Sequence, residues 1–138
     1  MPRIATIDER FQSYNVEIVE VTGGPFWRPY TPRASPAQPD QNLYEYRPPI
    51  DLTNSRLRRL AAALSPAYLR VSGTWANSTY FADSDSAPFE PPTGFKSVLN
   101  RAQWRAVVDF AQAVDARIVT SFAVSSGTRD AAGIWTPD

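Results

Sequence analysis

The 138 residues match the size of one ordinary domain, and 43% apolar with 12% aromatic side chains is enough for a hydrophobic core. Fourteen basic and fourteen acidic residues give a formal net charge of zero, so electrostatics argues against partners such as nucleic acid or an anionic membrane. Cysteine and histidine are absent, which excludes thiolate chemistry, disulfides, an imidazole base and the usual zinc ligands, and leaves acid–base chemistry to carboxylates.

Residues 11–21, FQSYNVEIVEV, are expected to form the first strand, because β-favouring residues alternate at Tyr14, Val16 and Ile18. Gly23-Gly24-Pro25 ends this strand. From about residue 23 to residue 50 the chain is rich in proline, which removes amide donors and argues against a helix or central strand. We predict an insertion there that is packed onto the main body by its aromatic residues, namely Phe26, Trp27, Tyr30, Tyr44 and Tyr46.

A helix followed by a strand is predicted next. Asp51 to Asn54 offers helix caps, and apolar residues then recur at helical spacing on one face, at Leu57, Leu60, Ala61 and Leu64. Pro66 stops the helix, residues 67–71 form the second strand, and a polar loop runs through Gly94.

A second helix and a third strand complete the predicted elements. Asn100 with Gln103 resembles a capping box, and it precedes an apolar stripe at Trp104, Val107, Val108, Ala111 and Val114. Residues 117–124, RIVTSFAV, then read as the third strand, and Thr136-Pro137-Asp138 as the start of a further helix.

The order strand, helix, strand, helix, strand predicts an α/β fold with a parallel sheet and right-handed crossovers. Three strands and two helices neither cover both faces of such a sheet nor close a barrel, which needs roughly 200 residues or more. We therefore expect residues 1–138 to be the amino-terminal portion of a larger protein. No secretion leader or membrane span is visible, and the compartment stays open.

The end of the second strand is the strongest candidate site. Ligands of α/β folds bind at the carboxyl ends of the strands, where Gly73, Thr74, Trp75 and Asn77 are expected. The alternative, that Gly73-Thr74 is only a turn from strand to loop, stays open on the local pattern.

LSPAYLRVSGT, residues 64–74, resembles the second-strand motif of glycoside hydrolase family 79, the heparanase and β-glucuronidase family. FQSYNVE, residues 11–17, resembles the family's first strand, and residues 116–135 occupy the place of its third. The resemblance implies an incomplete (β/α)8 TIM barrel, about the first three β/α units, with the remaining part of the barrel as a possible partner.

The family's activity is the retaining hydrolysis of glucuronic-acid-type glycosides by two glutamates about 5–5.5 Å apart, without a cofactor. The acid/base belongs to an Asn-Glu pair after the fourth strand. This sequence has no Asn-Glu pair. The resemblance therefore transfers no catalytic residue, and it implies a fragment that is inactive alone.

The resemblance does imply residues of this sequence that contact the substrate. Glu17 matches the acidic residue that ends the family's first strand, and Thr74 matches its second-strand threonine; both line the sugar site in relatives. Trp75 offers a face for a pyranose ring, and Asn77 follows on the same rim. The departures are Ser72 in place of a glycine and Ala123 in place of a rim asparagine, which leave substrate choice open.

A different class of function keeps the chain whole, as a small α/β carbohydrate-binding or interaction module. Its stacking surface would be formed by Trp27, Tyr30, Trp75 and Tyr80.

Several other features have ordinary interpretations. Glu20 is expected to be solvated or ion-paired, and no metal site is expected from Asp83, Asp85 and Glu90, which lack the spacing of a calcium loop. Trp104 is expected in the core. Residues 125–127 lack the setting of a nucleophile elbow.

Overall fold

The computed structural model describes residues 4–29, 43–86 and 90–136. At its centre lies a three-stranded parallel sheet with the order β1-β4-β7. Its strands are β1 (Ser13–Glu17), β4 (Ala67–Ser72) and β7 (Ala116–Thr120). The predicted mixed α/β fold with parallel strands is confirmed, and the described residues form no closed barrel.

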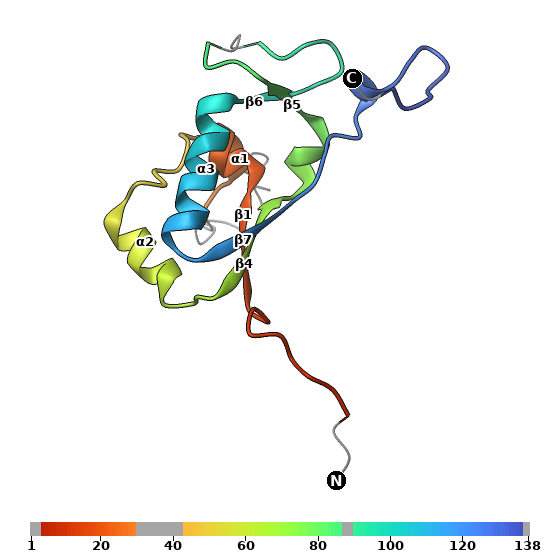
Figure 1. The fold of residues 1–138 in the computed structure, drawn as a ribbon. Coiled ribbons are helices and arrows are strands. Elements are labelled where there is room, and N and C mark those ends of the chain that lie inside the picture. Colours follow the sequence, from red (N-terminus) through yellow and green to blue (C-terminus); the bar gives the residue numbers. More distant parts are fainter. Residues whose placement is uncertain (1–3, 30–42, 87–89, 137–138) are drawn as a thin grey trace, which may run out of the picture.

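Two helices connect these strands and lie on the same side of the sheet (Figure 1). Helix α2 (Ser55–Ala62) begins where the side chain of Asn54 accepts hydrogen bonds from the backbone N–H groups of Arg56 and Leu57. Helix α3 (Arg101–Ala113) begins at the predicted capping box, in which Gln103 N–H donates to Asn100 at 2.8 Å and Asn100 N–H donates to Gln103 at 3.0 Å. Both predicted helices are therefore confirmed.

The apolar face predicted for α2 is only partly buried. Ala61 is buried and Leu57 packs against the core, but Leu60 is 62% exposed and Leu64 is 41% exposed. The reason is that α2 is short and packs against α3 along a narrow stripe.

The predicted first strand is too long. It ends at Glu17, and the chain turns into the short helix α1 (Ile18–Thr22). A carboxylate oxygen of Glu20, which was expected to be solvated or ion-paired, accepts the backbone N–H of Glu17 at 2.8 Å, so Glu20 caps this helix. Burial of Ile18, Val19 and Val21 outweighs the strand preference of these β-branched residues.

Two further strand pairs lie where no strand was predicted. Strands β2 (Gly24–Trp27) and β3 (Tyr44–Arg47) are antiparallel, with Trp27 opposite Tyr44. Strands β5 (Thr79–Ala82) and β6 (Ser97–Asn100) are parallel. Pro25 is tolerated in β2 because a two-stranded ribbon has only edge strands.

The remaining elements are two 3₁₀ turns, η1 (Thr74–Ser78) and η2 (Ser126–Thr128). The third strand ends at Thr120, four residues before its predicted end. The middle of the predicted insertion, including Tyr30, and the end of the predicted Thr136-Pro137-Asp138 helix start lie outside the described residues. No helix in the described part of the chain is long and apolar enough to span a membrane.

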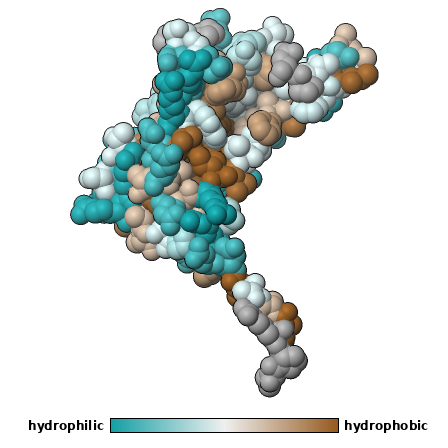
Figure 2. All heavy atoms as spheres, in the orientation of Figure 1, coloured by the Kyte–Doolittle hydropathy of each residue, from teal (hydrophilic) through white to brown (hydrophobic). Residues whose placement is uncertain are grey.

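The two faces of the central sheet differ sharply. On the face that the helices cover, Leu69 is 1% exposed and Val71 is 0% exposed. On the other face, Asn15, Arg70 and Arg117 are exposed, because successive residues of a strand point to opposite sides. Figure 2 shows apolar residues gathered in the middle of the molecule in this view, and the segment that includes β7 exposes Val119, Phe122 and Val124.

Candidate functional site

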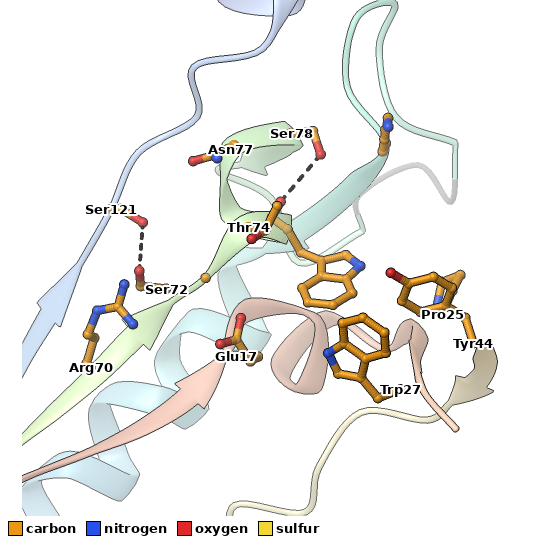
Figure 3. Close-up of a pocket in the computed structure, with 13 residues that line it drawn as sticks. Glu17, Pro25, Trp27, Tyr44, Arg70, Ser72, Thr74, Asn77, Ser78 and Ser121 are labelled. Atoms are coloured by element: carbon orange, nitrogen blue, oxygen red, sulfur yellow. Dashed lines mark hydrogen bonds between the residues drawn. The ribbon is translucent and has the colours of Figure 1, made fainter. Parts of the chain in front are cut away.

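A cavity of about 940 Å³ opens at the carboxyl ends of the sheet strands. Glu17, Thr74, Trp75 and Asn77, the four residues expected to contact a sugar, all line it. Figure 3 labels Glu17, Thr74 and Asn77 among them. The other lining residues are Pro25, Trp27, Tyr44, Arg70, Ser72, Gly73, Ser78, Lys96 and Ser121. The structure thus brings the predicted residues together and adds aromatic, cationic and hydroxyl groups.

Glu17 is held in place by neighbouring side chains of the sheet. It is the last residue of β1 and lies opposite Ser72 of β4. The amide of Asn15 donates to Glu17 Oε1 at 2.9 Å, and the guanidinium of Arg70 donates to Asn15 Oδ1 at 3.0 Å. Arg70, Asn15 and Glu17 therefore form one hydrogen-bonded row on the face of the sheet that carries no helix.

The second oxygen of Glu17 lies against a glycine. A Cβ atom at Gly73 would be 1.4 Å from Glu17 Oε2, and this oxygen is buried without a hydrogen-bond partner. Gly73 also has φ +102° and ψ 176°, a backbone conformation that is nearly restricted to glycine. Position 73 thus requires glycine both for its backbone and for the room it leaves to the carboxylate.

Gly73-Thr74 was expected either to be only a turn from strand to loop or to lie at a binding site. In the structure this segment begins a turn and also lines the cavity. The N–H of Ala76 donates to the carbonyl of Gly73 at 3.1 Å, which closes η1 directly after β4. At the other end, the hydroxyl of Thr79 donates to the carbonyl of Trp75 at 2.9 Å, and the N–H of Val124 donates to the carbonyl of Asn77 at 2.9 Å. The 3₁₀ turn is therefore fixed at both ends, with exposed Thr74 and Asn77 on the cavity rim.

Aromatic rings form one wall of the cavity. Trp27 and Tyr44, from the two strands of the β2–β3 pair, stack with ring centroids 4.8 Å apart at an angle of 29°. Tyr44 meets Trp75 edge-on at 6.3 Å, and Phe26 packs against Trp75 at 5.5 Å. Trp27 was expected to serve loop packing, and it does pack on Tyr44, yet 51% of it is exposed beside the cavity.

The third strand contributes a residue that the sequence did not single out. Ser121 lines the cavity, and its hydroxyl donates to the hydroxyl of Ser72 at 3.1 Å. Ala123, expected at this rim, is not among the lining residues, because β7 ends four residues earlier than predicted. If the third strand had been predicted to end at Thr120, Ser121 would have been expected at the carboxyl end of the strand.

Two other groups were also missed. Tyr44 was expected only to pack the insertion, and no local pattern marked Lys96, which is the only lysine of the chain. With Arg70, Lys96 supplies positive charge to the lining, against the single carboxylate of Glu17. The lining therefore has one positive charge in excess.

The acidic loop that follows the second strand pairs with α3. Arg101 donates to Asp83 Oδ1 at 2.7 Å, which lowers the pKa of Asp83, and Arg105 lies 3.4 Å from an oxygen of Asp85. Among residues 4–29, 43–86 and 90–136, no three acidic, histidine or cysteine side chains cluster in a way that could hold a metal. Elsewhere, hydrogen bonds from Thr53 lower the pKa of Asp51, and burial raises the pKa of Tyr14.

The alternative stacking surface is only partly assembled. Trp27 and Trp75 line the same cavity, whereas Tyr80 is not a lining residue and packs edge-on against Phe95 at 5.3 Å. Tyr30 lies outside the described residues.

Comparison of the chain with models of known protein families gives no match. Comparison with curated proteins gives no match either. The function must therefore be argued from the cavity itself.

Proposed function

We propose that this chain supplies the amino-terminal β/α units of a (β/α)8 barrel in a retaining glycosidase that acts on glucuronic-acid-type glycosides, with the cavity as part of its sugar-binding rim. The observation that carries the proposal is the meeting of Glu17, Thr74, Trp75 and Asn77 in one cavity at the carboxyl ends of parallel strands. In barrels and open α/β sheets this edge is where ligands bind.

The chemistry of the lining suits a sugar. A carboxylate, hydroxyl groups and an amide offer the donors and acceptors that sugar hydroxyls require, and the buried Glu17 Oε2 is an acceptor without a partner. The aromatic wall of Trp27 and Tyr44 adds apolar surface for the C–H face of a pyranose ring. A small number of polar groups that converge beside aromatic rings is typical of a small-molecule site.

The arrangement of the sheet is compatible with a barrel. The strand order β1-β4-β7 follows chain order, and α2 and α3 lie on the same side, as in a (β/α) unit repeat (Figure 1). The opposite face, which carries Asn15, Arg70 and Arg117, would then face the barrel interior. Further strands would extend the sheet at its β1 and β7 edges and cover the exposed apolar residues near β7.

The role we assign to these residues is binding rather than bond cleavage. Retaining hydrolysis requires two carboxyl groups about 5–5.5 Å apart, and Glu17 is the one acidic residue among those that line the cavity. The acid/base and the nucleophile would come from other parts of the barrel. The 138-residue chain is therefore expected to bind a glucuronide without hydrolysing it.

Titration of the 138-residue chain with methyl β-D-glucuronide, followed by calorimetry, tests the proposal. Thr74→Val and Glu17→Gln should each weaken binding about two- to tenfold, the effect of losing one hydrogen bond. Thr93→Val and Glu90→Gln are matched controls, because both residues are exposed and neither lines the cavity. No binding, or equal binding by the wild type and both cavity variants, would refute the assignment.

A further inference from the structure

The feature that carries a further inference is the single lysine beside the cavity. We infer that Lys96 selects acidic sugars over neutral ones by pairing with the ligand's carboxylate; this inference rests on the function proposed above. Lys96 is the only side-chain amine of the chain and lines the cavity immediately before β6.

The position of Lys96 is set by the backbone. Its N–H donates to the carbonyl of Ser78, the last residue of η1, at 2.8 Å. Since η1 is itself fixed at both ends, the lysine starts from a defined point on the rim. Its flexible four-carbon stem then lets the ammonium group reach a ligand that lies in the cavity.

Lys96 and Glu17 are associated with opposite ends of η1. Glu17 lies against Gly73, directly before the first residue of the turn, whereas Lys96 is bonded to the last. Five residues at the 3₁₀ rise of about 2 Å each span roughly 10 Å. A ligand carboxylate near Lys96 therefore avoids repulsion from Glu17, while hydroxyls at the other end of the ligand reach the Glu17 carboxylate.

The second cation of the lining is already engaged. Arg70 donates to Asn15, which in turn holds Glu17, and Figure 3 shows Arg70 on the side of Glu17 and Ser72, away from Trp27 and Tyr44. Asp85 lines an adjoining cavity together with Lys96, but it lies 3.4 Å from Arg105. Within the described part of the chain, Lys96 forms no ion pair of its own with an acidic side chain.

The test compares two ligands that differ at one group, methyl β-D-glucuronide with its carboxylate and methyl β-D-glucoside with a hydroxymethyl group. The wild type should prefer the glucuronide. Lys96→Met should weaken glucuronide binding about three- to tenfold, as expected for a partly exposed ion pair, and leave glucoside binding unchanged. Lys96→Arg should keep most of the preference, because it keeps the charge.

Arg59→Gln is the matched control, since it removes one charge from an exposed position of α2 outside the cavity. A second readout uses acylation of the amine, followed by mass spectrometry. Because Lys96 is the only lysine, its modification is read without interference from other side chains. Glucuronide should slow the acylation of Lys96, and glucoside should not.

The outcomes separate the two proposals. If both sugars bind and Lys96→Met leaves their affinity ratio unchanged, Lys96 is not the selecting residue, while the sugar-binding function stands. If neither sugar binds the wild-type chain, the proposed function fails and the role of Lys96 fails with it.

Discussion

The two faces of the central sheet are built from the same strands but have different roles. In β4, Leu69 and Val71 point into the core beneath the helices, whereas Arg70 and Ser72 point to the cavity side. In β1, Val16 packs against the core and Asn15 and Glu17 do not. The alternation of β1 and β4 therefore places the site residues of these two strands directly beside core residues.

This comparison shows where stability and recognition lie. The covered face holds large buried side chains, whose removal leaves a cavity in the core. The open face holds a hydrogen-bonded row of polar groups, in which Asn15 and Arg70 are exposed and Glu17 is half-buried. Substitutions on the two faces should therefore have separable effects on unfolding and on ligand binding.

The largest expected effect is on the covered face. Leu69→Ala should lower the free energy of unfolding by about 2–5 kcal/mol, because Leu69 is almost fully buried in the core cluster. Its neighbour Arg70→Ala should change it by less than about 1 kcal/mol, since the guanidinium is exposed. Urea unfolding followed by far-ultraviolet circular dichroism measures both values. Similar losses for the two variants would show that the open face also carries stability.

An intermediate effect is expected where the faces meet, at the end of β4. Gly73→Ala should cost about 1–3 kcal/mol from its backbone conformation, and more because the new methyl group collides with Glu17. The double variant Gly73→Ala with Glu17→Ala removes the collision but keeps the backbone strain. Its loss should therefore be smaller than the sum of the two single losses, measured by the same urea experiment. Additive losses would mean that the two residues do not interact.

The smallest effect concerns a surface ion pair outside both faces. The hydrogen bond from Arg101 lowers the pKa of Asp83 below its unfolded value of about 3.9. The stabilisation by this pair is therefore present above about pH 4 and disappears as the pH falls through the lowered pKa of the folded state. Asp83→Asn should be slightly less stable than the wild type at pH 7, and the difference should shrink toward pH 3. A difference that grows on acidification would contradict the assigned pairing.

Sequence patterns predicted the covered side of the sheet well. The capping box of Asn100 and Gln103, the cap at Asn54 and the strand after Pro66 are local signals, and each is read from a few neighbouring residues. The parallel order of the strands follows from the alternation of strands and helices.

Features that depend on distant contacts were missed. The β2–β3 and β5–β6 pairs join segments separated by long stretches of chain, which no local pattern reports. Helix α1 was assigned to a strand because Ile18, Val19 and Val21 favour strands by composition. The spacing of Glu17 and Glu20 was the available signal, since an acidic residue three positions into a helix caps its first residues.

The residues of the candidate site show the same difference between local patterns and distant contacts. Thr74, which comes directly after a strand, was predicted from the general rule for parallel sheets, whereas Glu17 was singled out only by the resemblance of residues 11–17 to the family's first strand. Tyr44 and Lys96 reach the cavity only through the additional strand pairs, so their place depended on folding beyond the central sheet. Whether these residues bind a sugar is decided by the binding experiments above.

The contact between Gly73 and Glu17 also limits which residues a related protein can carry at these two positions. A relative that keeps the glutamate in this orientation has no room for any side chain at the position of Gly73. A relative with a larger residue there must change the backbone conformation at this position, and it must also carry a different residue at position 17 or turn that side chain away. The two positions should therefore vary together across an alignment, and a group of sequences that breaks this pairing would have a differently shaped rim.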